Sequence, residues 1–365
     1  MNAMTRRIVI GTAAVSMAVS LAACGKAGDD KDSGSGGDSK TIGLLLPENK
    51  TTRYETFDRP LIEAKIKALC SDCDVKYNNA AQDTETQKKQ FDALVTQGVK
   101  VIILDSVDFK ATKSWVQQAD KKGVKVVAYD RLAEGPISAY VSYDNEKIGR
   151  LQGEALVKAL GDKAKDSNVV MINGSPTDPN APFFKKGAHS VLDTQVKKVV
   201  YEQDIPDWSP DEANKKMGAA IDSLGKKGFQ GVYSANDGMA GGIITALKKQ
   251  GVKVPVGGQD SELAGLQRII AGEQSFSIYK QIKPQAETTA GIAVDLLKGK
   301  KFDSLTNTKV DSLSGEFKGT PSRLYDASVV TKDNIASTII ADGVYKASDI
   351  CTAEFKAACD AAGIK

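Results

Sequence analysis

The segment Lys125-Val-Val-Ala-Tyr-Asp-Arg-Leu132 decides the interpretation of the fold, because an apolar run stops abruptly at an acidic and a basic residue. The run is short, β-branched and preceded by Gly123, which favours a buried parallel strand over a helix. In an open α/β sheet, ligands bind beyond the carboxyl ends of such strands. An isolated Asp–Arg pair would equally suit a salt bridge. A ligand role for Asp130 and Arg131 gains weight because the same pattern recurs along the chain.

Strands and helices alternate along the rest of the chain, which predicts parallel sheets with helices on both faces. The expected strands cover residues 41–47, 75–79, 99–105, 125–129, a strand ending at 143, 168–173, 197–202, 231–236, 254–260, 275–280 and 324–330. The expected helices cover 55–69, 84–97, 109–122, 146–160, 182–192, 210–224, 238–249, 263–271 and 285–297. One sheet of that many strands is unusual, so we expect two similar α/β lobes.

The first residues of the chain have the pattern of an export signal and not of a folded domain. Residues 1–7 are basic, residues 8–20 are apolar or small, and Leu21-Ala-Ala-Cys24 ends the segment. This order is typical of a secretory signal with a small-residue cleavage site. The segment is too short and too rich in Ala and Ser to be read as a membrane-spanning helix.

The sequence Leu-Ala-Ala-Cys-Gly around Cys24 resembles the bacterial lipobox, in which the Cys becomes the lipidated first residue of the mature protein. We therefore expect residues 1–23 to be a lipoprotein signal peptide and Cys24 to carry the lipid; the alternative is an ordinary signal peptide with a chance Cys. Residues 24–40 are rich in Gly, Ser, Asp and Lys, which is typical of a disordered tether.

Charge and hydropathy exclude two classes of protein. The net charge of +3 is small and the charges are interspersed, so no footprint for nucleic acid is present. No second long apolar segment follows the first one, so we expect a body outside the cytoplasm that contacts the outer face of the membrane only through Cys24. We also expect a monomer.

Four cysteines remain beyond Cys24, and their spacing leaves two interpretations. Cys70-Ser-Asp-Cys73 is a C-x-x-C motif, which in a cytosolic chain would suggest redox or zinc chemistry. Exported thiols tend to pair, so we expect two local disulfides, Cys70 with Cys73 and Cys351 with Cys359. Zinc is the weaker interpretation, because His189 is the single histidine and no second C-x-x-C exists. We expect neither metal nor cofactor.

Polar and aromatic residues gather where the expected strands end. Carboxylates, amides, Arg and Lys of this kind suit a neutral polyhydroxy ligand, because each hydroxyl both donates and accepts a hydrogen bond. Flat aromatic side chains can cover the C–H faces of a sugar ring. The residues concerned are Arg53, Tyr54, Asp130, Arg131, Asp144, Asn145, Asp178, Asn180, Asp207, Trp208, Asn236, Asp237, Gln259, Asp260 and Lys280.

Several of these segments resemble a known family. The chain from about residue 41 to 345 is similar to the xylose-binding members of the type I, ribose/galactose-like branch of ABC-transporter solute-binding proteins. The resemblance implies an α/β fold with two Rossmann-like lobes, a hinge of three crossings and a monosaccharide in the cleft between them. The matching segments are 125–132, 143–149, 173–181, 234–242, 258–265 and 270–280.

The resemblance also implies lobe boundaries and partners. We expect residues 41–144 plus 281–312 in the N-terminal lobe, 145–280 plus 313–350 in the C-terminal lobe, and a C-terminal extension over 351–365. The implied partners are an ABC permease and its ATPase. The implied ligand is D-xylose, and the alternative is a binder of several sugars (glucose, galactose, arabinose) that presents sugar to a membrane sensor or chemoreceptor.

Position by position, the resemblance assigns ligand contacts to both lobes. Tyr54 stands where the xylose binders have Trp, and Asp105-Ser-Val-Asp108 departs from their sequence, so the sugar is less firmly implied than sugar binding itself. The contacts implied are Arg53, Tyr54, Asp130 and Arg131 in the first lobe, Asp178, Asn180, Trp208, Asn236 and Asp260 in the second, and Lys280 at the crossing.

Some of these residues also suit purely structural roles. Trp208 could be an ordinary core aromatic. Asp144-Asn145 suits a hinge and helix cap, and Asp237-Gly238 suits a helix cap. Phe183 and Phe184 suit helix packing, although one could line the cleft.

Catalysis and gene regulation are poorly supported. Asp130, Asp178 and Asp260 are each expected to have an Arg, Asn or Lys partner, which would keep them ionised and not tuned as acids. No nucleophile elbow accompanies His189, and no G-x-G-x-x-G follows the first strand. A repressor with this architecture would begin with a helix-turn-helix, where this chain has a signal, a Cys and a linker. We therefore expect no enzyme and no DNA binder.

Overall fold

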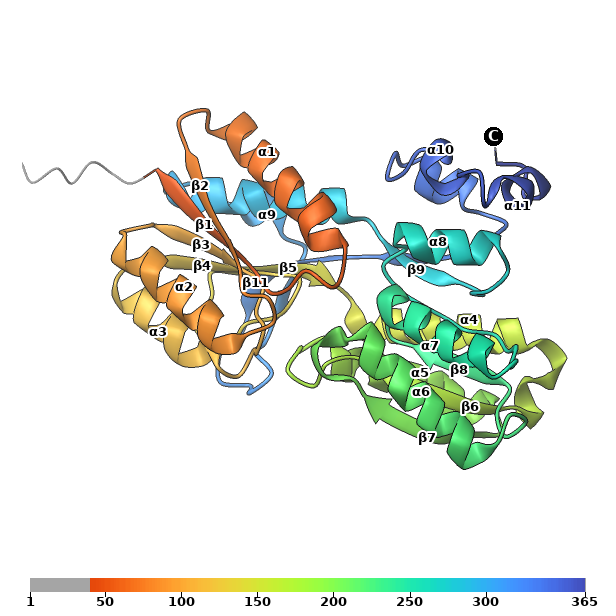
Figure 1. Cartoon of the computed structure of the whole chain (residues 1–365). Helices are drawn as coiled ribbons and strands as arrows, with labels where there is room; N and C mark the ends of the chain where they lie inside the picture. The colour runs from red at the N-terminus through yellow and green to blue at the C-terminus, as the bar shows by residue number, and fades with distance from the viewer. Residues whose placement is uncertain (1–39, 365) are drawn as a thin grey trace, which may run out of the picture. The chain divides into compact units, whose positions relative to one another are not determined.

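The computed structural model describes residues 40–364, and its first lobe is built on a seven-stranded sheet (Figure 1). The strand order is β10-β11-β5-β4-β3-β1-β2, parallel throughout except that β10 runs antiparallel to β11. All the carboxyl ends of the parallel strands therefore meet at one edge. The strands are β1 (Thr41–Leu46), β2 (Asp74–Asn79), β3 (Val101–Leu104), β4 (Lys125–Tyr129), β5 (Ala139–Tyr143), β10 (Thr308–Val310) and β11 (Thr320–Tyr325).

Helices cover both faces of this sheet because the central strands are apolar on both sides. In β1, Leu44 and Leu46 pack with helices α1 (Arg59–Leu69) and α9 (Ile282–Leu297). Leu45 points the other way and packs with α2 (Thr84–Thr96) and α3 (Thr112–Lys121). The alternation along one strand thus supplies two separate cores, and Figure 1 shows the two helix pairs on opposite sides of the sheet.

The second lobe repeats this plan around a shorter sheet in the order β7-β6-β8. All its helices and strands except α8 contribute to one core, in which the β6 residues from Val169 to Ile172 are fully buried. The elements are α4 (Asn145–Leu160), β6 (Asn168–Asn173), α5 (Ala181–Gln195), β7 (Lys198–Asp204), α6 (Pro210–Leu224), β8 (Gly231–Ser234), α7 (Asp237–Lys249), α8 (Leu263–Ile270), β9 (Ser277–Lys280) and β12 (Ala327–Val330).

The strand expected over residues 254–260 is wrong as a continuous element. Only isolated bridges join Val256 to Val232 and Gln259 to Ile278. Pro255 has no N–H to give to a ladder, although its carbonyl accepts a 2.9 Å hydrogen bond from Val232 N. The segment nevertheless continues the sheet and leads to β9, which pairs antiparallel with β12.

The chain passes between the lobes at three places, around Asp144, Gln281 and Asp326. The expected strand 324–330 is split, because β11 pairs with β5 in the first sheet and β12 pairs with β9 in the second lobe. The expected assignment of residues 313–325 to the C-terminal lobe is therefore wrong, since apolar alternation does not reveal which sheet a strand joins.

The residues after β12 form short helical segments on the second lobe. Ile350 and Cys359 are buried with Ile269 and Ile270 of α8, and a disulfide joins Cys351 to Cys359. A second disulfide, Cys70–Cys73, closes the turn between α1 and β2. The remaining short segments are η1 (Tyr54–Asp58), η2 (Gly161–Asp166), η3 (Pro206–Trp208), η4 (Asp303–Leu305), η5 (Ala336–Ile340), α10 (Ala347–Ile350) and α11 (Lys356–Ala361).

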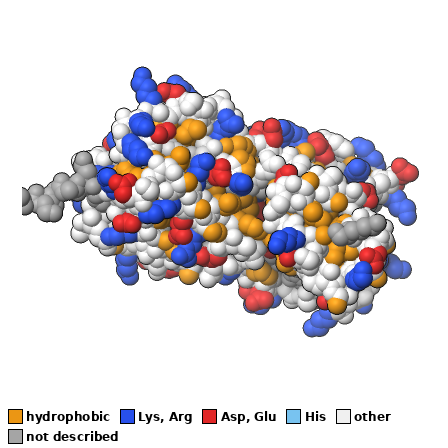
Figure 2. Space-filling model, turned by 90° about the horizontal axis from the view of Figure 1, so that it is seen from above, with side chains coloured by type: hydrophobic (Ala, Val, Ile, Leu, Met, Phe, Trp, Pro, Cys, Tyr) orange, Lys and Arg blue, Asp and Glu red, His pale blue; other side chains and the backbone are white. Residues whose placement is uncertain are grey.

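The surface carries charges of both signs. On the face seen in Figure 2, Lys and Arg side chains alternate with Asp and Glu and form no patch of one sign. Among the helices of residues 40–364, none has the length and apolar character needed to cross a bilayer. The signal peptide expected over residues 1–23, lipidation at Cys24 and the tether up to residue 39 lie outside the described residues.

Candidate functional site

All ten residues expected to contact ligand line one cavity, which we call the central cavity. Its volume is about 290 Å³, and its walls come from both lobes, at the carboxyl ends of β4, β6 and β8 and in the β1–η1 loop. Thr51, Phe184 and Gln259 complete the lining. The ten residues are Arg53, Tyr54, Asp130, Arg131, Asp178, Asn180, Trp208, Asn236, Asp260 and Lys280.

Asp130 follows β4 directly and is held in a left-handed backbone conformation with φ of 56°. Its carbonyl oxygen accepts hydrogen bonds from Ser142 Oγ (2.6 Å) and Tyr140 OH (3.1 Å) of the neighbouring strand. A non-glycine residue in this region is strained, and such strain is concentrated at functional sites. The tight turn directs both Asp130 and Arg131 into the cavity.

The carboxylate of Asp130 is an ionised acceptor. Its Oδ1 accepts hydrogen bonds from Arg53 Nη1 and Gln285 Nε2, each at 3.1 Å. Burial acts to raise its pKa, but the positive charges of Arg53 and Lys280 outweigh burial and lower the pKa to about 2. A ligand hydroxyl in the cavity would thus meet a permanent acceptor.

Arg53 is fixed on the other side by residues of η1 and α9. Its Nη2 lies 2.6 Å from Asp58 Oδ1 and 2.7 Å from Gln285 Oε1, and its Nε lies 3.0 Å from Asp58 Oδ2. Only 3% of Arg53 is exposed, so these partners compensate a buried charge. The guanidinium is therefore pre-oriented toward Asp130 and the cavity.

Arg131 is surrounded by three carboxylates. Its Nε lies 2.8 Å from Asp178 Oδ2 and 3.4 Å from Asp105 Oδ1, and its Nη2 lies 3.9 Å from Glu48 Oε1. Burial raises the pKa of Asp105 well above its ordinary value, and it also raises that of Asp178 despite Arg131 nearby. Asp178 thus has the expected Arg partner, but the desolvation of a crowded carboxylate cluster outweighs the effect of one shared cation on its pKa.

The second lobe supplies Asn180 and Trp208. Asn180 Nδ2 donates to the Asp130 carbonyl at 3.2 Å, and its Oδ1 accepts a 2.7 Å hydrogen bond from Asn145. Trp208 Nε1 donates to Asp178 Oδ2 at 3.2 Å. Trp208 also belongs to the second-lobe core, so the structural and cavity-lining roles coincide in this residue.

Asn236 takes the capping role that was expected of its neighbour and keeps its place in the cavity lining. Asn236 Oδ1 accepts a 2.9 Å hydrogen bond from Met239 N, so Asn236 caps α7 while also lining the cavity. The cap expected at Asp237-Gly238 is wrong, because Asp237 is fully buried and bonds to Gln274 and Ser277 instead.

The cap of α4 expected at Asp144-Asn145 is confirmed. Asp144 is the capping residue, and its Oδ1 accepts a 2.9 Å hydrogen bond from Lys147 N. Asn145 is the first residue of the helix and turns its side chain to Asn180, behind the cavity wall.

Lys280 closes the cavity at the end of β9. Its Nζ lies 2.9 Å from Asp260 Oδ1, and it also lies 5.5 Å from the ring centroid of Tyr143 and 5.8 Å from that of Phe184. Asp260 has a φ of 93°, a second strained acidic residue at the site. Lys280 thus adds a buried cation to the cavity lining.

The lining can therefore satisfy a small ring with hydroxyl groups on several sides. Carboxylate acceptors, cationic donors and one indole face are the combination that such a ligand needs. In the described residues, the one group of His, Cys, Asp and Glu side chains close enough to share a metal is Cys70, Asp72 and Cys73. Its two sulfurs are joined in a disulfide, so they are not thiolate ligands.

Sequence reasoning missed the outer layer of the site. Gln285 and Asp58 lie on helices and orient Arg53 and Asp130. In a sequence, a polar residue within a helix is usually interpreted as solvent-exposed. Thr51 and Glu48 lie in the first loop, where Glu48 Oε2 accepts the Thr51 N–H at 3.0 Å. The sequence feature that could have indicated these two residues is that they directly follow β1, whose carboxyl end lies at the same sheet edge as Asp130.

Two α/β lobes with a polar cavity at their parallel strand ends define a class, the two-lobed solute-binding proteins. Comparison with known proteins places the chain more closely. Residues 42–301 match the family described as Periplasmic binding protein domain, and the chain belongs to this family. Members of the family bind solutes and are not enzymes, so this chain is not an enzyme.

Individual relatives cover most of the chain. It is 36% identical over 316 residues to the D-xylose-binding periplasmic protein of Escherichia coli K12, covering 85% of this chain and 92% of that protein. It is 31% identical to a multiple sugar-binding periplasmic receptor of Rhizobium radiobacter, covering 86% and 93%. A solved ABC transporter solute-binding protein of Clostridium phytofermentans with bound β-D-glucose superposes with a TM-score of 0.77 at 26% identity, covering 85% and 99%.

Proposed function

We propose that the protein captures one aldopyranose, D-xylose, in the central cavity and delivers it to an ABC permease driven by its ATPase. The observation that carries the proposal is the convergence of ten polar and aromatic residues from both lobes on one cavity of about 290 Å³.

The chemistry of the lining supports a neutral sugar over an anion or a cation. Charges of opposite sign are paired around the cavity: Arg53 with Asp130, Arg131 with Asp178, and Lys280 with Asp260. A charged ligand would leave one of these buried groups without its partner, at a cost of several kcal/mol. A ring hydroxyl can serve both kinds of neighbour at once.

A binder of several aldoses is the second candidate. Tyr54 lines the cavity on the first-lobe side with its hydroxyl 3.4 Å from Arg131 Nη2, and it replaces the Trp implied by the resemblance to xylose binders. The relative from Rhizobium radiobacter carries the name of a multiple sugar-binding receptor, which supports this candidate. In this form, the loaded protein would present sugar to a membrane sensor or chemoreceptor.

Calorimetric titration of the full-length protein in detergent with xylose, glucose, galactose, ribose and arabinose tests both candidates. One-to-one heat with xylose alone supports the first, and heat with several aldoses supports the second. Absence of heat with every sugar, together with no sugar-dependent rise in the melting temperature, would contradict the proposal, because any ligand that binds the folded state stabilises it.

We further propose that residues 1–23 are a signal peptide, that Cys24 is lipidated, and that the protein is a monomer tethered to the outer face of the membrane. The periplasmic location named for its relatives supports export. Cys24→Ser should shift the protein from the membrane fraction to the soluble fraction, as read by immunoblot, and sedimentation should give the mass of one chain. Unchanged fractionation of the variant would contradict the anchor.

A further inference from the structure

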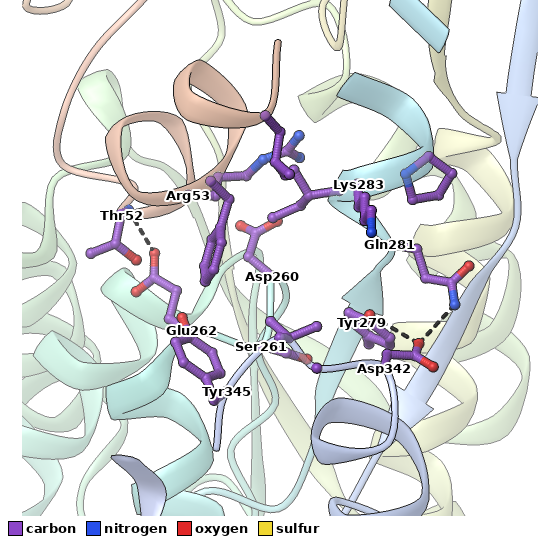
Figure 3. A pocket seen from close by; sticks show the side chains of 16 residues that line it. Thr52, Arg53, Asp260, Ser261, Glu262, Tyr279, Gln281, Lys283, Asp342 and Tyr345 are labelled. Carbon is purple, nitrogen blue, oxygen red and sulfur yellow. Dashed lines mark hydrogen bonds between the residues drawn. The ribbon is translucent and has the colours of Figure 1, made fainter. Parts of the chain in front are cut away.

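A second cavity adjoins the central cavity and has no role in the function proposed above. We call it the hinge cavity, because residues 281–284 of one crossing form part of its wall. It is open to solvent, and both lobes contribute to it. Figure 3 shows Arg53 and Thr52 of the first lobe facing Asp260, Ser261 and Glu262 of the second.

Arg53 and Asp260 line both cavities, so they form the boundary between them. Each is held by other residues: Arg53 by Asp58 and Asp130, and Asp260 by Lys280. Within residues 40–364, no ion pair within 4.0 Å joins Arg53 to Asp260. The boundary therefore consists of two side chains that are each held by ion pairs with other residues and form no ion pair with each other.

The hinge cavity presents aromatic and aliphatic surface. Phe57 and Leu61 come from the first lobe, and Val344 and Tyr345 come from the segment after η5. The rings of Phe57 and Tyr345 meet edge to face, with centroids 5.4 Å apart and planes at 73°. Half-buried aromatic rings of this kind cover the C–H faces of sugar rings at low entropic cost.

Polar groups lie beside this surface. Ser261 is 2% exposed, lines the cavity, and its Oγ has no hydrogen-bond partner among the described residues. Glu262 is 7% exposed and accepts a 3.1 Å hydrogen bond from Thr52 N, which links the two lobes across the cavity. A buried hydroxyl without a partner is costly, and a ligand hydroxyl would supply the missing hydrogen bond.

We propose that the hinge cavity receives the second ring of a disaccharide whose first ring occupies the central cavity. The ligand class then includes short pentose oligosaccharides and not only the free sugar. This inference rests on the proposed function of the central cavity. It explains why aromatic surface and an unpaired hydroxyl lie together behind the Arg53–Asp260 boundary, where a single ring would not reach.

The test compares D-xylose, its β-1,4-linked disaccharide xylobiose, and phenyl β-D-xyloside by calorimetric titration of the full-length protein in detergent. We expect xylobiose to bind within about tenfold of the xylose affinity or more tightly. Phe57→Ala and Tyr345→Ala should each weaken xylobiose binding by about tenfold and change xylose binding by about twofold at most. Leu61→Trp places a larger side chain in the hinge cavity. It should likewise weaken xylobiose binding and leave xylose binding nearly unchanged.

Phe302→Ala is the matched control, because Phe302 is also half-buried in the first lobe but lies outside the hinge cavity. Thermal melting of each variant establishes that it is folded. Xylose binding without xylobiose binding would overturn this inference and leave the proposed function intact. Binding of phenyl xyloside but not xylobiose would overturn it as well, in favour of aryl glycosides. Equal loss of xylose and xylobiose in the folded variants would also overturn it.

Discussion

Arg131 and Asp178 are joined across the two lobes by a 2.8 Å contact between Nε and Oδ2, with both side chains buried. Arg131 follows β4 of the first sheet, and Asp178 lies in the loop after β6 of the second. A hydrogen bond between Phe109 N and the Thr177 carbonyl (3.3 Å) crosses the interface beside them. The residues that would hold a ligand thus also hold the lobes against each other.

Asp178→Ala should therefore weaken lobe closure in the absence of sugar. Arg131 would keep Asp105 and Glu48 as partners but lose its contact with the second lobe. We expect a larger radius of gyration by small-angle X-ray scattering and a loss of sugar affinity of about 2–5 kcal/mol. Asp162→Ala, which removes an exposed carboxylate of the same lobe, is the control. Identical scattering of wild type and Asp178→Ala would refute this role.

Asp130→Ala should abolish sugar binding. The substitution removes the carboxylate that faces Arg53 and Gln285, leaving a buried cation with one partner fewer and the ligand without its acceptor. The expected loss is at least about 3 kcal/mol, which moves binding beyond detection by calorimetry. Wild-type affinity in a folded Asp130→Ala protein would remove the central cavity from consideration as the sugar site.

Gly174→Ala should displace Trp208 from the cavity wall. A Cβ at position 174 would lie 2.0 Å from Trp208 Cη2, and the indole cannot move without breaking its hydrogen bond to Asp178. We expect destabilisation of about 1–3 kcal/mol and weaker sugar binding. The measurements are thermal melting and tryptophan fluorescence, because Trp208 is one of only two tryptophans.

Gly218→Ala is the matched control for this change. Gly218 lies inside α6, and an added Cβ would have no neighbour within 4 Å. Alanine in a helix interior should leave stability unchanged or raise it by up to about 1 kcal/mol. If both variants were equally stable and bound sugar equally well, the contact between Gly174 and Trp208 would have no importance for the site.

Glu262→Gln should make the protein less sensitive to alkaline pH. Burial, with the negative charges of Asp237 and Asp260, raises the pKa of Glu262 to about 8 from its ordinary value of 4.5. The folded protein therefore retains a proton that the unfolded chain releases, so this group lowers stability as pH rises from about 5 to 8. The loss is on the order of a few kcal/mol, since one pKa unit corresponds to about 1.4 kcal/mol.

Chemical denaturation at several pH values between about 5 and 8 measures this effect as the difference between wild type and variant. Glutamine keeps an oxygen that can accept the hydrogen bond from Thr52 N, so the interlobe contact itself is retained. The advantage of the variant should grow with pH. Parallel stability curves for the two proteins would show that Glu262 does not titrate in this range.

The sequence was most informative where chemistry and topology coincide. Asp130, Asn236 and Lys280 each end a run of strand-forming residues, and parallel strands bring such ends to one edge, so their convergence on the central cavity was predictable. That these residues contact the ligand remains a prediction. Gln285 could not be found in this way, because it reaches the site from α9, far along the chain and on another element.

The errors have physical causes of the same kind. Residues 324–330 form one β-favouring run, yet β11 and β12 join different sheets. The residues of the run do not indicate which strands it pairs with. The α7 cap was assigned to Asp237 because Asp and Asn are equally good caps, and the choice of Asn236 depends on the burial of Asp237 beneath Gln274.

The three crossings are close to one another, which has a consequence for how the protein can change over evolutionary time. Tyr143 OH donates to the Gln281 carbonyl at 2.9 Å, and Lys147 Nζ lies 2.5 Å from Asp326, so all three crossings are connected. Substitutions of these four residues would alter the ease and angle of lobe rotation without changing a residue that lines the central cavity. The strength of sugar capture and the choice of sugar can therefore be adjusted by separate sets of residues.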